Sequence, residues 1–216
     1  IGLLHRAVAD ALAAERPDLV ALTGDVIDGD AHLPALAELL SMLRASGAEL
    51  VATLGNWEHW GGVDLPSLEE VYAKAGARLL VNDAAPVRRG LVVVGTDDGC
   101  TGRASLPRAF RDAPAGRPRL LLSHAPGLFE GRLEGAEAAL SLAGHTHGGQ
   151  VRALTKAVVL PPGSGPFVAG PYTTAAGPLY VNRGAGTSVV PARFCCRPEL
   201  ALFRLRAGAQ PAIAPR

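Results

Sequence analysis

The sequence predicts an α/β fold in a single domain, and three features of the chain carry this prediction. In the first half, segments with helical spacing of apolar residues alternate with short apolar runs that fit strands buried on both faces. The second half is richer in strand-like runs, and 26 glycines and 17 prolines indicate many turns rather than a helical bundle. The chain has 216 residues, of which 48% are hydrophobic, and this is enough for one sizeable core. We therefore expect one domain over residues 1–216, with residues 207–216 as a frayed tail.

Three helices are predicted in the first half of the chain. Residues 3–16 carry apolar side chains at helical spacing, and Pro17 ends the segment. Two further helices are predicted over residues 34–46 and 66–75, each followed directly by a glycine.

Short apolar runs predict the strands. They lie at residues 18–23, 50–54, 79–81, 91–94, 119–122, 138–142, 179–181 and 200–205. Between two of these runs, residues 161–178 are crowded with glycine and proline and are predicted to form a long loop. Long ordered loops in a compact domain tend to serve function.

Charge, cysteines and hydropathy exclude several classes of protein. The net charge of +1 gives no basic surplus for binding nucleic acid, so none is expected as a partner. The three cysteines form no Cys-x-x-Cys pair, and the adjacent Cys195 and Cys196 do not fit a mutual disulfide. No apolar run is long enough to cross a bilayer. The chain begins at Ile1 and its one methionine is Met42, so we expect an N-terminal segment to have been removed, which leaves the cytoplasm and the cell envelope both open as locations.

Four predicted strands end in a small residue followed at once by a side chain that can bind metal. These pairs are Gly24-Asp25, Gly55-Asn56, Ser123-His124 and Gly144-His145. In an α/β sheet the ligand crevice lies beyond the carboxyl ends of the strands, so these side chains are expected to converge there. His147 lies two positions after His145, on the same side of an extended stretch. Oxygen and imidazole ligands without sulfur suit manganese, iron or zinc, and Asp25 is able to bridge two such cations.

Taken singly, most of these residues have a plainer explanation. Asp25 with Asp28 fits a helix cap, Asn56 fits a turn, and His124 fits a hydrogen-bonded polar group of the core. The glycine-flanked pair of His145 and His147 is better explained as metal ligands, and the set of five together favours a metal site.

The motifs in this order resemble those of the calcineurin-like metallophosphoesterases, and the segment after residue 178 looks like the YkuE-like bacterial branch. The resemblance rests on Gly24-Asp25-Val-Ile-Asp28, Gly55-Asn56, Ser123-His124-Ala-Pro126, Gly144-His-Thr-His-Gly-Gly-Gln150 and Leu179-Tyr-Val-Asn-Arg-Gly-Ala-Gly186. It implies a β-sandwich flanked by helices, in four α/β/β/α layers, with two divalent metals whose bound hydroxide attacks phosphorus. It further implies Asp25 as the bridging ligand, Asn56, His124 and His145 on one metal, and His147 on the other.

Two departures from the family pattern affect these expectations. The family has an Asp-x-His motif on a first strand, whereas here His5 lies in the predicted helix and Leu3 stands two positions before it. We expect that strand to have been cut off; if the protein truly lacks it, a single metal is expected. The family also has His directly after the asparagine, where this chain has Trp57. His59 is then the candidate catalytic proton donor, beside Asn56 as a metal-binding catalytic residue. Alternatively, His59 is a loop residue and Trp57 a pocket wall.

The predicted function is metal-dependent hydrolysis of a phosphodiester or phosphomonoester. Its expected partner is a small or lipid-linked phosphoester, with association at a membrane surface as a further expectation. The residues that bind substrate are not identified, although Phe167 and Tyr172 in the long loop fit either a cleft wall or ordinary packing. The alternative is a binding protein or scaffold that keeps the fold without catalysis, which Trp57 and the absent first motif both favour.

Overall fold

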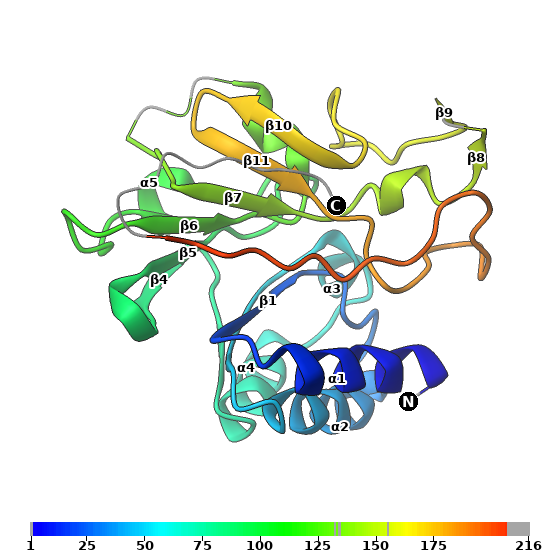
Figure 1. The fold of residues 1–216 in the computed structure, drawn as a ribbon, viewed down its shortest axis with the longest axis horizontal. Helices are drawn as coiled ribbons and strands as arrows, with labels where there is room; N and C mark the ends of the chain where they lie inside the picture. Colours follow the sequence, from blue (N-terminus) through cyan, green and yellow to red (C-terminus); the bar gives the residue numbers. More distant parts are fainter. Residues whose placement is uncertain (1, 132, 134, 155, 207–216) are drawn as a thin grey trace.

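Two β-sheets packed face to face form the body of the protein (Figure 1). The computed structural model describes residues 2–131, 133, 135–154 and 156–206. The smaller sheet is parallel, in the order β1-β2-β3, and consists of β1 (Leu19–Thr23), β2 (Glu49–Thr53) and β3 (Ala77–Leu79).

The larger sheet has six strands in the order β10-β11-β7-β6-β5-β4. Its members are β4 (Asp83–Pro86), β5 (Val92–Gly95), β6 (Arg119–Leu122), β7 (Leu140–Ala143), β10 (Gly170–Thr174) and β11 (Gly177–Val181). The four central strands are parallel, and the two edge strands, β4 and β10, run antiparallel to their neighbours. A separate hairpin joins β8 (Arg152–Ala153) to β9 (Lys156–Ala157).

Alternation along the strands divides the apolar side chains between the two faces of each sheet. Val51 of β2 and Val93 of β5 belong to the buried cluster between the sheets. Leu50 points the other way, into the cluster beneath the helices, and Val94 points to the outer face of the larger sheet. Because side chains alternate with a period of two, these uninterrupted apolar runs are buried on both faces, as the sequence predicted.

Helices cover the outer face of the smaller sheet. They are α1 (Leu3–Glu15), α2 (Leu33–Arg44) and α4 (Leu65–Lys74), with Leu12, Leu40 and Leu68 buried against the strands (Figure 1). The outer face of the larger sheet is covered by the short α5 (Leu106–Ala109), the 3-10 turn η3 (Pro126–Glu130) and coil. The architecture is therefore the expected α/β sandwich, although its fourth layer contains little helix. Among the described residues, no helix combines the length and hydropathy needed to span a membrane.

Several elements differ from the sequence prediction. Residues 161–178 were expected to be loop, but Gly170–Thr174 forms β10, which pairs with β11. The prediction was wrong because glycine and proline at an edge strand resemble turn residues. Residues 200–205 were expected to be a strand, but the segment is coil, since among the described residues no strand pairs with it. Strand β4 and helices α3 (Asn56–Trp60) and α5 were missed, because they are too short to show a clear period. The expected frayed tail, 207–216, lies outside the described residues.

Candidate metal centre

The carboxyl ends of strands from both sheets meet at one place. Asp25 follows β1 and Asn56 opens helix α3 after β2, so the smaller sheet supplies an acid and an amide. His124 follows β6 and His145 follows β7, so the larger sheet supplies two imidazoles. The backbone N–H of Gly144 donates to the carbonyl of His124 at 3.0 Å, which joins the ends of β6 and β7.

Four possible ligand atoms surround one point. Nε2 of His124 lies 3.0 Å from Oδ2 of Asp25 and 3.2 Å from Oδ1 of Asn56. The same nitrogen lies 3.1 Å from Nδ1 of His145. Asp25, His124 and His145 form a group of possible ligands whose atoms are all within 4.8 Å of one another. Four of the five expected metal residues are thus brought together.

Backbone carbonyls fix which nitrogen of each imidazole is free to bind a cation. Nδ1 of His124 lies 2.6 Å from the carbonyl oxygen of Thr23, and Nε2 of His145 lies 2.6 Å from that of Pro162. Because a carbonyl only accepts, each of these nitrogens carries a hydrogen and donates it. In the neutral rings, Nε2 of His124 and Nδ1 of His145 therefore keep their lone pairs, which point at each other. Such hydrogen bonds are typical of metal-binding histidines.

The donor set fits a divalent cation. With both rings neutral, the central group consists of a carboxylate oxygen, an amide oxygen and two nitrogen lone pairs, which repel one another. A cation among them removes this repulsion, and mixed oxygen and imidazole ligands suit manganese, iron or zinc. Without metal, a proton on His124 serves the same purpose, and metal binding is then expected to release it.

The pKa directions in the centre follow from burial and from the Asp25–His124 contact. Burial opposes the charged form of Asp25, but the hydrogen bond and charge of His124 outweigh it and hold the pKa of this carboxyl below its usual value. Burial likewise opposes a charge on His124, yet the bond to Asp25 raises its pKa. Burial and the neighbouring His124 lower the pKa of His145, so this ring favours its neutral, metal-binding form.

His147 lies on the wall of the same cavity but apart from the four converging atoms. The cavity has a volume of about 150 Å³ and is lined by Asp25, Trp57, His124, His145, His147 and the segment 182–188, named here the glycine loop. Burial and then the charge of Arg193 lower the pKa of His147 to about 4, so its imidazole is neutral at physiological pH. Its position suits a ligand to a second cation beside the first. A larger hollow, of about 410 Å³ and lined largely by glycines, contains none of the expected site residues.

Glycine and left-handed backbone allow the ligands to approach one another. Asp25, His145 and His147 all have positive φ, at 54°, 66° and 48°. This conformation is unfavourable for residues other than glycine and is concentrated at functional sites. Gly24 has a φ of 85°, and a Cβ placed on it would lie 2.5 Å from the backbone nitrogen of Gly55. The loops after β1 and β2 therefore approach each other at Gly24 and Gly55 too closely for a side chain at Gly24.

The carboxylate of Glu58 holds these two loops in place. It is 2% exposed and accepts hydrogen bonds from four backbone N–H groups. Oε2 accepts from Asp25 at 3.0 Å and Gly55 at 2.8 Å, and Oε1 accepts from Val26 at 2.6 Å and Ile27 at 3.3 Å. Glu58 therefore neither faces solvent nor bonds to His59 in the described structure, where its hydrogen bonds go to the backbone of the two loops. Burial, followed by the nearby charge of Asp25, raises the pKa of this carboxyl.

Arg193 holds the glycine loop against His147. Its guanidinium donates to the carbonyl oxygens of His147 at 3.1 Å, Arg183 at 2.7 Å, Gly184 at 3.1 Å and Gly186 at 2.8 Å. One side chain thus joins the backbone of an expected ligand to the opposite wall of the cavity.

Gln150 and Trp57 complete the attachment of the glycine loop. The amide of Gln150 donates to the carbonyl of Ser188 at 3.0 Å and accepts from its N–H at 2.8 Å. Nε1 of Trp57 donates to the hydroxyl of Ser188 at 2.9 Å. Trp57 therefore forms part of the cavity wall at the position where the resemblance leads one to expect histidine.

His59 lies on α3 but outside the lining of the cavity. Its Nε2 is 2.6 Å from Oδ1 of Asp97, in a contact where both side chains are largely buried. Asp97 follows β5, the neighbour of β6, so the pair lies at the same sheet edge as His124. The structure shows a partner that orients His59, and the expected catalytic role of this residue remains a prediction.

Sequence reasoning missed Glu58, Arg193 and Gln150. A signal for Glu58 was present, because Gly55-Asn-Trp-Glu58 has the spacing of a capping box, with the acid at the third helical position. No comparable signal marks Arg193, whose partners are backbone carbonyls 7 to 46 positions away in the chain.

The chain is similar in sequence to known phosphoesterases. A sequence model of the family described as calcineurin-like phosphoesterase matches residues 3–149, a range that contains all five expected metal residues. Phosphodiesterase YaeI of Escherichia coli (strain K12) is 33% identical over 208 residues, covering 92% of this chain and 75% of that protein. The metallophosphoesterase YkuE of Bacillus subtilis (strain 168) is 29% identical, and the match covers 88% of this chain and 68% of YkuE. A metallophosphoesterase of Aquifex aeolicus (strain VF5) is 28% identical, with coverages of 89% and 74%.

Proposed function

This chain belongs to the calcineurin-like phosphoesterase family, and on that premise we propose that it hydrolyses phosphodiesters at a divalent-metal centre. The observation that carries the proposal is the convergence of Asp25, Asn56 and His145 on Nε2 of His124, at 3.0, 3.2 and 3.1 Å. A phosphodiester is favoured over a monoester because a relative at 33% identity is named a phosphodiesterase.

The chain's own residues hold and orient the reacting groups. A divalent metal, when bound, polarises the phosphoryl group and activates the attacking water. Asp25, Asn56, His124 and His145 would hold that metal, and His147, on the wall of the same cavity, would hold a second. Glu58 fixes the loop that carries Asp25, so the carboxylate is already in place before substrate arrives.

The glycine loop is the proposed substrate-binding wall. It lines the cavity opposite the ligands and is held by Arg193, Gln150 and Trp57. Phosphate oxygens placed in the cavity would face this loop, from which Asn182, Arg183 and Gly184 all line the cavity. A rigid loop lowers the entropy cost of positioning the ester for in-line attack.

His59 is the proposed proton donor to the leaving group. It lies three residues after Asn56 on α3, and Asp97 holds its Nε2. A histidine oriented by a carboxylate is suited to general acid catalysis. His59→Ala is then expected to lower turnover while metal content stays unchanged, and unaltered turnover would exclude this role.

The proposal is tested by hydrolysis of bis(p-nitrophenyl) phosphate and p-nitrophenyl phosphate in the presence of manganese. The wild-type protein should cleave the diester faster. His145→Ala should lose bound metal and at least about 10²-fold in kcat, because the centre loses one of its four converging donor atoms. His32→Ala is the matched control, since His32 is an exposed histidine paired with Asp28 on the surface.

Two results would contradict the proposal. A metal-loaded protein without turnover on either ester would favour the scaffold alternative, for which the tryptophan at position 57 is the supporting observation. Full metal content in His145→Ala would instead show that the four converging atoms are not the metal site.

A further inference from the structure

Seven large apolar side chains are exposed at one edge of the molecule. They are Val151, Leu154, Val158, Val159, Val189, Val190 and Phe194, named here the apolar rim. Leu154 and Val189 are each 87% exposed and Phe194 is 63% exposed. Single exposed apolar residues are common on soluble proteins, but a group of this size marks an interaction surface.

Hydrogen bonds join the segments that carry the rim. Val151 forms a β-bridge with Phe194, and the N–H of Val158 donates to the carbonyl of Val151 at 3.2 Å. The side chain of Gln150 donates to the carbonyl of Val190 at 2.7 Å. The hairpin β8–β9 and the segment 189–194 therefore form one surface, at the right of Figure 1.

The apolar rim lies at the mouth of the candidate metal centre. Gln150 bonds both to Val190 in the rim and to Ser188 in the glycine loop. Arg193, directly before Phe194, donates to the carbonyl of His147. A partner that binds the apolar rim would therefore lie next to the cavity.

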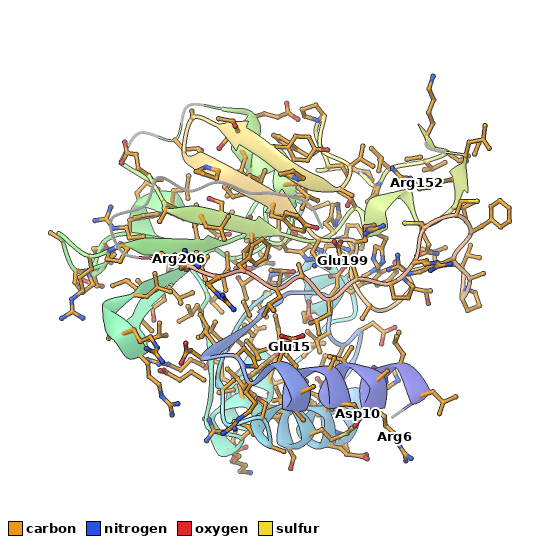
Figure 2. The ribbon with its side chains drawn as sticks, viewed as in Figure 1. Arg6, Asp10, Glu15, Arg152, Glu199 and Arg206 are labelled. Carbon is orange, nitrogen blue, oxygen red and sulfur yellow. The ribbon has the colours of Figure 1, made fainter. Side chains whose placement is uncertain are left out.

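Every charged residue in the segments that carry the rim is basic. From Ala138 to Pro198 the sequence contains no Asp or Glu, although the whole chain has 20 acidic residues. The basic residues of this stretch are Arg152, Lys156, Arg183, Arg193 and Arg197. Arg152, which is labelled in Figure 2, belongs to strand β8 of the hairpin. Arg152 and Lys156 lie in the β8–β9 hairpin and Arg193 lies in the segment 189–194, whereas Arg183 is paired with Glu199.

We propose that the apolar rim docks this protein onto the surface of an anionic lipid membrane. Exposed aliphatic and aromatic side chains insert into the boundary between headgroups and acyl chains, and nearby Lys and Arg are attracted to anionic headgroups. A protein partner would be expected to pair these cations with acidic side chains. The same part of a second copy of this chain has no Asp or Glu to offer. Membrane docking goes beyond the proposed hydrolysis, because it requires no turnover.

Cosedimentation with lipid vesicles tests the proposal. The intact protein is mixed with vesicles of phosphatidylglycerol and phosphatidylethanolamine, and in parallel with vesicles of phosphatidylcholine alone. We expect binding to the anionic vesicles, weakened by high salt, and at least tenfold weaker binding to phosphatidylcholine. The double variant Leu154→Gln/Val189→Gln should lose at least tenfold in partitioning, and Lys156→Gln/Arg197→Gln should lose the preference for anionic lipid.

The matched control is Leu3→Gln, because Leu3 is 88% exposed but lies on α1, outside the rim. It should bind vesicles as the wild type does. Thermal unfolding of each variant shows that folding is preserved, and all substituted side chains are on the surface. The proposal is overturned if the wild type does not cosediment with anionic vesicles, or if the rim variants bind these vesicles as well as the control does. It is equally overturned if the rim instead mediates dimers that the double variant dissociates in sedimentation velocity.

Discussion

At the scale of single residues, Glu58 joins the loop that carries Asp25 to the loop that carries Asn56. Its carboxylate accepts hydrogen bonds from backbone N–H groups of both the β1 loop and the β2 loop. Glu58 is not among the residues that line the cavity. Positioning therefore depends on a buried charge whose four donors are all backbone amides. Such a charge is stabilised only while every donor is present.

Glu58→Gln is expected to destabilise the protein and weaken its metal binding together. The glutamine keeps the size of the side chain, but its NH₂ group must face backbone N–H donors that previously bonded a carboxylate oxygen. We expect a loss of about 2–3 kcal/mol in the free energy of unfolding and weaker manganese binding by calorimetry. Glu38→Gln, at an exposed position of α2, is the control. Unchanged metal affinity in Glu58→Gln would show that Asp25 holds its position without this support.

His147 is expected to make the metal-free protein less stable in acid. Its pKa is about 4 in the folded protein, against 6.5 for an unperturbed histidine. Between these values the unfolded chain binds the proton and the folded chain does not, so stability falls as pH drops from about 6.5 to 4, by up to about 3 kcal/mol.

His147→Asn isolates this contribution, because asparagine tolerates the positive φ of 48° at this position. Denaturant unfolding in the presence of a chelator should show a smaller loss of stability in the variant than in the wild type over this pH interval. Equal losses in the two proteins would mean that His147 titrates normally when folded.

At the scale of elements, the centre depends on how closely the ends of β1 and β2 approach. Each strand is followed by a glycine that the other loop contacts, and helix α3 begins directly after the second of them. The parallel pairing of β1 with β2 brings the two loops to the same level. Local sequence chemistry and sheet register therefore act together to place Asp25 beside Asn56.

Gly24→Ala tests this close approach. A Cβ at this position would both adopt an unfavourable φ of 85° and lie 2.5 Å from the nitrogen of Gly55. Gly47→Ala is a matched control, because Gly47 has a φ of 80° with open space around it. We expect the control to lose about 1 kcal/mol of stability from backbone strain alone and Gly24→Ala to lose at least about 2 kcal/mol more. Equal losses in thermal unfolding would show that the loops have room to move apart.

At the scale of the whole molecule, the sequence predicted which side chains converge better than it predicted the residues that support them. Asp25, Asn56, His124 and His145 were predicted to converge because parallel strands end at one sheet edge, and the structure brings them together there. This inference succeeded because it needed only strand direction and the residue after each strand. The hydrogen bonds from Arg193 to four backbone carbonyls were not predictable, because every residue has a backbone carbonyl whatever its side chain.

The same contrast applies to the elements. The main strands and helices of the first half were predicted within a few residues. Helices buried on one face show a clear period, and strands buried on both faces are continuous apolar runs. Strand β10 was missed because its pairing with β11 depends on the edge of a sheet that forms only in three dimensions. The segment 200–205 has the apolar content of a strand, yet a strand also requires a neighbour, which the local sequence does not specify.

Anomalous diffraction from crystals grown with manganese tests the central claim most directly, namely that His124 and its three neighbours bind a divalent cation. We expect an anomalous peak within coordination distance of both Nε2 of His124 and Nδ1 of His145, and next to the oxygens of Asp25 and Asn56. A peak elsewhere, or fully ordered side chains with no peak among them, would contradict it.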